Sequence, residues 1–517
     1  MLFNKLISRL HYILMIVLIA GIAISCDDDD EDPVGPQPTG EEKVYTLYNT
    51  SFEAFGTVKF VELDDNSTRV IIDLNNDTGP HPGHIHMGST FEPGQVVIDL
   101  NNVINGASTT EISEDNAGND VTYDDLLAYD GYVALHVSES DLTVAATADI
   151  GPNELTGNIE DYPLFVPNSL TQIDGGIFFV EKVGGDVWVA VSASVGVAGM
   201  MHPMHIHDNS AAETGDVAIT LNELNGDTDF SATLIQDRNF DNLSSFDGYV
   251  NIHLSVDDIG TIVAQGDIGS NALTGEVTQY TLEERNDSGV TGVVEIYKRE
   301  GGHSLVMIDL VNTTQGTIYP VEIWSNSSIE SGSKLIELNS INGSSGKGLN
   351  TIREDNSGDV TYAVLTSSYN ANLRVYLPDE TVAARTDIGG NALSGESTTY
   401  NFVAVDNSGI EGTATFKQRL NGYTLLEIQL TGTPDQGIHP AHIHSGSISN
   451  PGGIAINLNE VDGTSGNSRT TIRETNAQEN ITYETLTTTY EGYINVHLAP
   501  NALETVVTQT NIGGSAQ

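Results

Sequence analysis

The sequence predicts an all-β protein, built from four tandem antiparallel β-sandwich domains that follow an N-terminal signal segment. First, a phrase of nine residues recurs at intervals of roughly 120 residues, close to the length of one sandwich domain. Second, each interval contains short strand-like segments separated by Gly, Asn, Asp and Pro, with no helical periodicity. Third, the composition, with 52 Gly and 7% aromatic residues, is typical of strands joined by turns.

The repeated phrase sets the domain organisation. It reads HPGHIHMGS from His81, HPMHIHDNS from His202 and HPAHIHSGS from His439, and the remaining copy reads YPVEIWSNS from Tyr319. The phrases ADIGPNELTG, GDIGSNALTG and TDIGGNALSG keep the same interval. The predicted segments are a signal peptide at 1–25, an acidic tether at 26–42, and repeats at 43–162, 163–283, 284–401 and 402–517.

The strands of one repeat can be predicted from its apolar segments and the turn residues between them. A single helical turn is expected at 482–486 in the fourth repeat and at 122–127 in the first. About seven short strands without helical periodicity favour an antiparallel sandwich. In the fourth repeat the predicted strands are 413–419, 423–432, 441–446, 454–461, 470–474, 492–498 and 505–512.

The N-terminus has the pattern of a bacterial lipoprotein signal. Lys5 and Arg9 precede an apolar run, Tyr12 to Ile24, which fits a signal-peptide core and is short for a membrane span. The run leads into AISC, in which Cys26 is the protein's single cysteine. A small residue before a lone cysteine resembles the lipobox, which implies that Cys26 is the acylated N-terminus and the membrane anchor. The alternative is a plain signal that is cleaved without lipidation.

The segment after Cys26 predicts where the protein is displayed. It reads DDDDEDPVGPQPTGEE, which is acidic, contains Pro and lacks core residues, as expected of a tether. An acidic run directly after the lipidated cysteine resembles the surface-export signal of some Gram-negative lipoproteins. We therefore expect an outer membrane lipoprotein exposed on the cell surface, with the periplasmic face as the second choice. A single cysteine also excludes an intramolecular disulfide.

The net charge of −53 restricts the classes of partner. Such a chain repels nucleic acid backbones and anionic lipid, so no nucleic acid partner is expected, and cations are its natural counterpart. The alternative is that the acidic surface simply keeps an exposed protein soluble. Calcium is a weaker hypothesis for loops such as SEDNAGND at 113–120, since their spacing matches no defined calcium loop. The sequence names no protein or polysaccharide partner.

Histidine is concentrated in three sets of four. The protein has 14 histidines, and only His11 and His303 lie outside these sets. Chance placement explains such clustering poorly. The sets are His81, His84, His86 and His136; His202, His205, His207 and His253; and His439, His442, His444 and His497.

Strand geometry predicts which way these histidines point. Side chains alternate between the two faces of a strand, so His84 and His86 share one face and the isoleucine between them takes the other. In GYVALH, the same alternation places Tyr132, Ala134 and His136 opposite the apolar face. Three imidazoles therefore lie on the outer face and converge if the two strands are neighbours. Neutral imidazoles at that density suit Zn²⁺ or Cu²⁺. The alternative is a hydrogen-bonded cluster that ties loops to the sheet.

The third repeat loses the whole set at once. Tyr319, Glu322, Trp324 and Tyr376 stand at the four histidine positions. This joint loss indicates that the four positions work as a unit. It also indicates that the fold forms without the histidines.

The HxxHIHxG phrase, with a later GYVxxH strand and a strand of the GDIG type, resembles the CHRD domain, which is named from chordin and also occurs in bacterial secreted proteins. The resemblance recurs along nearly the whole mature chain. It implies an immunoglobulin-like β-sandwich, distantly similar to Cu,Zn superoxide dismutase, without a settled activity. By that analogy His81, His202 and His439 brace the sites from behind, and up to three copper or zinc ions are expected. The implied ligands are His84, His86 and His136; His205, His207 and His253; and His442, His444 and His497.

The sequence departs from the dismutases in several ways. No histidine lies between His86 and His136, so the bridging imidazole and the zinc subsite are missing. No Lys or Arg occurs from Val70 to Val180, so no local cation attracts an anionic substrate to the first site. In the second site MMHPMHIH offers three methionines, whose thioethers would favour Cu(I) as ligands or would otherwise pack under a loop.

Three functions remain open at this stage. The first is an array of lipid-anchored modules that bind transition metal for structure or for capture. The second is a structural or adhesive array in which the histidines organise loops. The third is a copper redox enzyme, which needs an open coordination position. The sequence leans away from an enzyme, because it carries no other catalytic motif.

Overall fold

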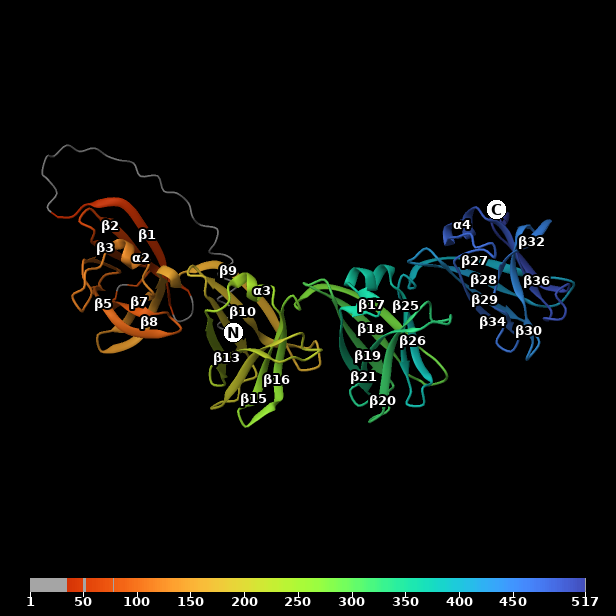
Figure 1. Cartoon of the computed structure of the whole chain (residues 1–517), viewed down its shortest axis with the longest axis horizontal. Helices are drawn as coiled ribbons and strands as arrows, with labels where there is room; N and C mark the ends of the chain where they lie inside the picture. The colour runs from red at the N-terminus through yellow and green to blue at the C-terminus, as the bar shows by residue number, and fades with distance from the viewer. Residues whose placement is uncertain (1–34, 50–52, 78, 517) are drawn as a thin grey trace. The chain divides into compact units, whose positions relative to one another are not determined.

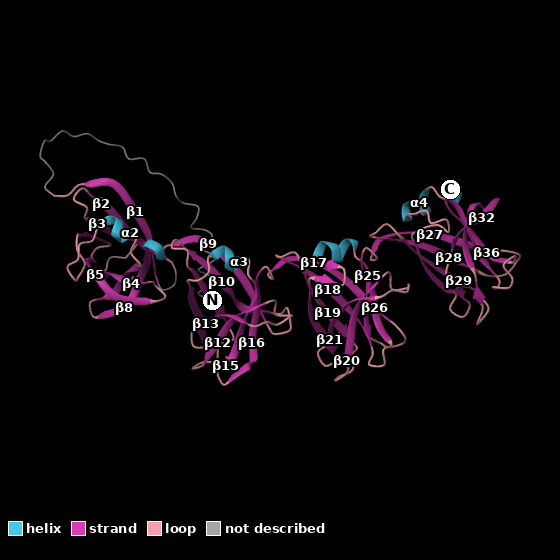
Figure 2. Ribbon diagram, in the orientation of Figure 1, coloured by secondary structure: helices cyan, strands magenta, loops and turns pink. Residues whose placement is uncertain are grey.

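The computed structural model of this chain describes residues 35–49, 53–77 and 79–516. The predicted signal peptide, Cys26 and the first part of the tether lie outside these residues. The described chain is nearly all β, which confirms the predicted fold class (Figure 2). Within the described ranges, no helix has the length and apolar character needed to cross a membrane. The chain divides into two compact units, Met1–Ala272 and Leu273–Gln517, each with two repeats.

The first repeat is one eight-stranded antiparallel sheet with the order β5-β4-β7-β8-β1-β2-β3-β6 (Figure 1). β1 joins its two four-stranded halves, because it pairs with β2 along most of its length and with β8 through Tyr48 and Asn49. The sheet therefore curls around one core. The elements are β1 (Pro38–Asn49), β2 (Ala54–Leu63), β3 (Thr68–Leu74), β4 (His81–Gly88), β5 (Pro93–Val103), β6 (Ala107–Ile112), α2 (Tyr123–Leu127), β7 (Gly131–Ser138), β8 (Asp141–Ile150) and η1 (Gly151–Asn153).

The second repeat closes the same arrangement into a barrel with the order β10-β11-β14-β13-β12-β15-β16-β9. Closure comes from short pairings, Asn225 with Phe230 and Gln265 with Phe165. The elements are β9 (Leu155–Phe165), β10 (Gln172–Lys182), β11 (Val187–Ala193), β12 (Met201–Asp208), β13 (Val217–Asn225), β14 (Phe230–Ile235), α3 (Phe240–Ser244), β15 (Asp247–Ser255) and β16 (Asp258–Gly269).

The third repeat has an eight-stranded sheet in the order β21-β20-β25-β26-β17-β18-β19-β22, the order of the first repeat. Its elements are β17 (Leu273–Glu284), β18 (Thr291–Arg299), β19 (Ser304–Val311), β20 (Ile318–Ser325), β21 (Lys334–Asn342), β22 (Lys347–Ile352), β23 (Glu354–Asp355), β24 (Gly358–Asp359), η2 (Val364–Ser368), β25 (Asn370–Tyr376) and β26 (Val382–Gly389).

The fourth repeat again follows this order, β32-β31-β35-β36-β27-β28-β29-β34. Its elements are β27 (Leu393–Ala404), β28 (Glu411–Arg419), β29 (Thr424–Thr431), β30 (Ile438–His439), β31 (Ala441–Ser447), β32 (Asn450–Asn457), β33 (Val461–Asp462), β34 (Asn467–Ile472), α4 (Tyr483–Thr488), β35 (Glu491–His497), β36 (Val506–Gly513) and η3 (Gly514–Ala516).

The two helical turns predicted from sequence are present as α2 and α4. Each begins after a threonine whose hydroxyl accepts a hydrogen bond from the third backbone N–H of the turn, Thr122 from Asp125 and Thr482 from Thr485. These bonds satisfy N–H groups that have no partner inside a helix. The Thr-Tyr dipeptide at 122–123 and at 482–483 therefore fixes where each helical turn starts.

The first strand of every repeat starts ahead of the predicted domain edge. The edges at 43, 163, 284 and 402 fall within β1, β9, β17 and β27 or at their ends. These strands complete the sheets that follow them, since β9 pairs with β10 and β27 pairs with β28. The phrases ending in LTG and LSG therefore lead directly into the next repeat.

Each repeat has its own apolar core, formed by alternate residues of its strands. Ile85 in β4 and Val133 and Leu135 in β7 have no exposed surface and pack in the core of the first repeat. Full burial of such a side chain contributes roughly 1.5–3 kcal/mol. The residues between them, including the histidines, must then point to the other face.

Candidate metal centres

The histidines of each set lie on adjacent strands. β4 and β7 are antiparallel neighbours, with His84 opposite Ala134 and His86 opposite Tyr132. His136 lies two residues beyond Ala134 on the same face, diagonal to His84 and within reach of its ring. β12 pairs with β15, and β31 with β35, in the same register. The condition that the two strands be neighbours is therefore met three times.

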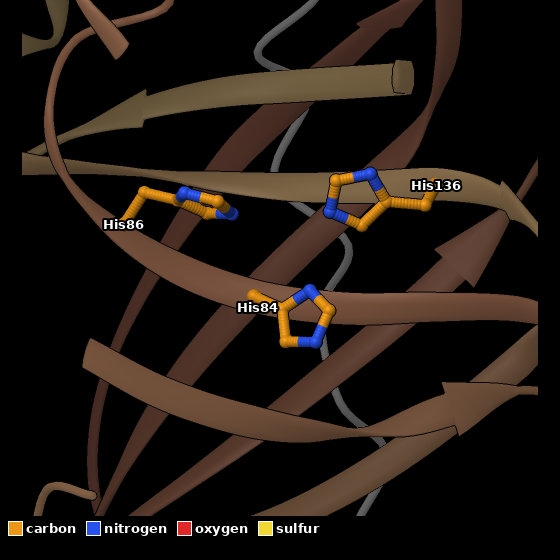
Figure 3. A group of neighbouring side chains, drawn as sticks. All are labelled: His84, His86 and His136. Carbon is orange, nitrogen blue, oxygen red and sulfur yellow. The ribbon is translucent and has the colours of Figure 1, made fainter. Parts of the chain in front are cut away.

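The three rings of each set converge. Figure 3 shows His84, His86 and His136 pointing toward one another from β4 and β7. In every set, one nitrogen of each ring lies within 4.8 Å of the others. Metal–nitrogen bonds of about 2.0–2.1 Å need these atoms within about 4 Å, so the rings need to close by no more than about 1 Å. The sets are His84, His86 and His136; His205, His207 and His253; and His442, His444 and His497.

Hydrogen bonds to carbonyl oxygens fix the tautomer of two rings in the first site. Nδ1 of His86 lies 3.1 Å from the Gly94 carbonyl oxygen, and Nδ1 of His136 lies 2.8 Å from that of Leu142. A carbonyl oxygen only accepts, so both Nδ1 atoms carry the proton and donate it. The lone pair of each neutral ring is then on Nε2, which is the state a metal ligand requires.

The second and fourth repeats reproduce this pattern. Their counterparts of His86 donate to a glycine carbonyl in the same place, and two further rings of each site approach each other nitrogen to nitrogen. The contacts are His207 Nδ1 with Gly215 O at 3.0 Å, His444 Nδ1 with Gly452 O at 3.2 Å, His205 Nδ1 with His253 Nε2 at 3.2 Å, and His442 Nδ1 with His497 Nε2 at 3.2 Å.

Several nitrogens that face these clusters are buried without a partner. A buried polar atom that lacks a hydrogen bond costs roughly 1–3 kcal/mol, and a bound ion would remove that cost. Among the residues that the structure describes, these atoms are His84 Nδ1, His86 Nε2, His207 Nε2 and His444 Nε2.

The first histidine of each phrase supports the backbone of the site rather than its rings. Nδ1 of His81 lies 2.9 Å from the carbonyl oxygen of His136, and His202 and His439 contact His253 and His497 in the same way, at 3.2 and 3.1 Å. The bond ties the start of one strand to the residue that carries the third ring on the other. The remaining nitrogen of His81 lies 2.9 Å from an Asp77 carboxylate oxygen.

Burial keeps several of these rings neutral. Desolvation is the first cause that lowers the pKa of each, and neighbouring imidazoles lower it further. A ring whose pKa is lowered keeps its lone pair available for a metal to a more acid pH. The histidines concerned are His84, His86, His205, His253, His442 and His497.

The outer face of the sheet is more enclosed than strand alternation alone suggests. Tyr132 and His136 are 4% and 7% exposed although they point away from the core. Tyr132 stacks on the His86 ring with 4.9 Å between ring centres, and the carbonyl groups of Gly94, at the start of β5, and Leu142, at the start of β8, contact the histidines. The sites are therefore partly buried clusters of imidazole rings rather than an open surface.

The third repeat fills the same place with ionic groups of its own. Glu322 accepts a hydrogen bond from Trp324 Nε1 at 2.7 Å and lies 3.2 Å from Lys334 Nζ. Burial tends to raise the pKa of Glu322, but these two groups lower it overall. The Arg374 guanidinium lies over the Trp324 ring, 4.6 Å from its centre. Tyr319, in place of the first histidine, accepts from the Thr314 N–H at 2.9 Å, as His202 does from Val197.

One methionine of the second site, Met204, points away from its histidines. Met204 is 1% exposed and packs in the core, with Ile206, on the face opposite His205. Met201 is largely exposed. Thioether ligation by Met204 is therefore wrong, because strand alternation turns it inward.

The acidic loop proposed for calcium uses its central carboxylate internally. Asp115 Oδ1 accepts from the backbone N–H groups of Ala117 and Asn119, and Oδ2 accepts from the Asn119 side chain. The hydrogen bond from the Asn119 side chain is the first cause that lowers the pKa of Asp115. These bonds engage both oxygens of Asp115 within the loop, and calcium binding there stays a prediction.

The sites differ in residues that the sequence argument missed. His84 Nε2 lies 3.7 Å from Asp99 of β5, where the second and fourth repeats have Thr220 and Asn457. Facing His205 and His442 are Asn251 and Asn495, each with a buried side-chain oxygen that has no partner in the described chain. The signal that could have found them is cross-strand register, which one sequence does not provide.

Comparison with protein-family models, curated proteins and solved structures found no match for this chain. The functional argument therefore depends on the residues themselves.

Proposed function

We propose that the first, second and fourth repeats each bind one copper or zinc ion through three histidines, and that the chain is a metal-binding array of CHRD-like domains. The observation that carries this proposal is the convergence of three imidazoles in each site, with one nitrogen of each ring within 4.8 Å of the others. Imidazole suits both metals, and at equal availability Cu²⁺ binds more tightly than Zn²⁺.

The residues present fit such an ion. His86 and His136 have their proton fixed on Nδ1 by carbonyl oxygens, so Nε2 is free to bind. Three protein ligands leave one position of a tetrahedral ion for water or another small ligand. When bound, the metal would supply a Lewis-acidic centre; the chain's own contribution is to orient three rings and to shield them from bulk water.

The lipid anchor belongs to the same proposal. The signal pattern and the acidic run after Cys26 support an outer membrane lipoprotein that displays the repeats at the cell surface, with the periplasmic face as the alternative. Three sites on a tethered chain of net charge −53 would favour the capture of cations near the membrane.

Metal analysis of the purified mature chain tests this function. After incubation with Cu²⁺ or Zn²⁺ and removal of free ion, we expect about three equivalents. His84→Ala, His205→Ala and His442→Ala should each remove one, whereas the matched control Glu322→Ala, at the corresponding position of the third repeat, should remove none. A chain that retains neither metal would overturn the proposal.

A structural or adhesive array is the second candidate function, and the third repeat favours it. That repeat keeps the strand order of the others while its Glu322–Lys334 pair replaces the histidines. If this function is correct, variants that lack all three sites should bind any surface partner as well as the unmodified chain.

A further inference from the structure

Among the residues that the structure describes, three lysine or arginine side chains are buried. Lys182, Arg299 and Arg419 are 3%, 0% and 1% exposed. They occupy one equivalent position, because each ends the second strand of its repeat, namely β10, β18 and β28. The first repeat has the buried Leu63 at this position, at the end of β2. A buried cation destabilises a fold unless a carboxylate or carbonyl groups accept from it, so its partner identifies its role.

In the second unit, Arg419 of the fourth repeat is paired with the third. Its Nη1 donates to Asp387 Oδ2 at 2.7 Å and also to the Asn391 carbonyl oxygen. The other carboxylate oxygen, Asp387 Oδ1, accepts from the Ser328 N–H inside the third repeat, at 2.6 Å. Asp387 therefore serves both its own repeat and the next.

Two backbone hydrogen bonds accompany this pair. Leu420 N–H donates to the Ala392 carbonyl oxygen and Asn421 N–H to that of Gly390, both at 2.9 Å. The turn between β28 and β29 is thereby fastened to the turn that precedes β27. The contact between the two turns therefore consists of a few polar interactions, and its backbone hydrogen bonds fix which residues of the two repeats face each other.

The first unit has the same junction. Val183 N–H donates to Glu154 O and Gly184 N–H to Pro152 O, both at 2.8 Å, in the positions of the two bonds above. Burial raises the pKa of Asp149 to about 6, and the charge of Lys182 acts in the opposite direction. Two separate units therefore use one arrangement.

The fourth repeat differs from the others at the carboxylate position. The phrases DIGPN, DIGSN and DIGGN place Asp149, Asp267 and Asp387 at the carboxylate position, but the fourth repeat reads NIGGS, with Asn511 and Ser515. Asn511 Oδ1 still accepts from the Ile448 N–H at 3.0 Å. The Asn511 amide therefore keeps this hydrogen bond within the fourth repeat, but it has no negative charge that could pair with a cation of another repeat.

We propose that the Asp387 carboxylate and the Asn391 carbonyl oxygen form a docking socket that accepts the buried Arg419 of the following repeat, and that the uncharged Asn511 leaves the fourth repeat without such a socket. The partner that fits a socket is a sandwich repeat with Lys or Arg at the end of its second strand. The first repeat, with Leu63, is not such a partner. This inference is independent of metal binding.

Hydrogen exchange of the full mature chain, followed by mass spectrometry, tests the socket. The variant Asp387→Asn copies the residue of the fourth repeat and keeps an oxygen for the Ser328 N–H. We expect at least tenfold faster exchange in peptides that contain the Leu420 and Asn421 amides, with the strands of both repeats unchanged. The matched control Asn511→Asp should leave these peptides as they are.

A second pair of variants separates docking from folding. Arg419→Lys should retain slow exchange at Leu420 and Asn421, since Lys182 fills the position in the first unit, and Arg419→Met should lose it. Unchanged exchange in both Asp387→Asn and Arg419→Met would overturn the proposal. Faster exchange throughout the fourth repeat would also overturn it, since the pair would then support the repeat itself.

Discussion

The third repeat and the three histidine-bearing repeats share one fold and differ on one face. At the position of the site, the third repeat has Glu322, Trp324 and Tyr376 with two cations, Lys334 and Arg374. The other repeats have three converging imidazoles, and among the described residues each of these sites has at least one buried inward nitrogen without a protein partner. The comparison teaches that one fold supports two different arrangements on this face. One repeat has charged side chains that contact one another, and three have converging imidazoles that could hold a metal ion.

The strand register indicates that the charged side chains of the third repeat and the histidine clusters of the other repeats exclude each other. Lys334 lies opposite Trp324 where Val96 lies opposite His86, and Arg374 takes the place of Ala134. A lysine and an arginine at these positions would repel a metal ion. The change from histidine therefore involves the cross-strand neighbours as well as the ligands.

Grafting a site into the third repeat gives the largest expected effect. The substitutions Glu322→His, Trp324→His and Tyr376→His, combined with Lys334→Val and Arg374→Asn, should raise the metal content from about three to about four equivalents. The three histidine substitutions alone should add none, because Lys334 and Arg374 still repel the ion. If the variant with all five substitutions folds but still binds only three equivalents of metal, this explanation of the difference between the repeats is wrong.

Removal of the supporting histidine His202 should have the next largest effect on metal binding. His202→Ala removes the contact with the His253 carbonyl oxygen that lies behind the second site. Loss of such a supporting contact typically lowers metal affinity roughly 10–100-fold. Competition with a chelator of known affinity measures this, and the first and fourth sites serve as internal controls. Equal affinity at all three sites of the variant would show that His202 is not needed.

A pH effect should also separate the repeats in the metal-free protein. Burial lowers the pKa of His205, His253, His442 and His497 below the ordinary value of about 6.5. Below that pH the unfolded chain binds more protons than the folded one, so stability falls as the pH falls through the folded pKa.

Hydrogen exchange at pH 7.5 and 5.5, corrected for intrinsic rates, measures this difference. Peptides from β12 and β31 should lose protection at the lower pH, and those from β20 in the third repeat should lose less. Equal losses in all three strands would mean that the histidines do not control the acid stability.

The smallest effect is expected at Asp99. Its carboxylate lies 3.7 Å from His84 Nε2, the nitrogen that faces away from the cluster, and it raises the basicity of that ring. Asp99 is largely exposed, so Asp99→Asn should weaken the first site only about 2- to 5-fold. Titration of each site against a chelator would detect this change, and a stronger first site in the variant would contradict the assignment.

Much of the site could be predicted from sequence because strand alternation is local. The HIH phrase places His84 and His86 on one face, and the GYVxxH phrase places His136 on the same side. The four repeats supplied the rest, since their phrases recur at similar intervals. The all-β class followed from the same patterns and is confirmed.

Features that depend on pairing between strands could not be predicted. Lys334 and Arg374 are far from Glu322 in sequence and meet it only through the register of β20 with β21 and β25. The enclosure of Tyr132 and the pair of Arg419 with Asp387 likewise arise from contacts between distant segments. A single sequence shows the alternation of apolar and polar residues along each strand, but it does not show which strands are neighbours in the sheet.

The most direct measurement of the central claim is X-ray absorption at the metal edge of the loaded mature chain. The account predicts about three imidazole nitrogens per ion at roughly 2.0–2.1 Å, with the multiple scattering typical of histidine rings. A shell of oxygen ligands without imidazole would contradict it, since the metal would then be held by the acidic surface and not by the three histidine clusters.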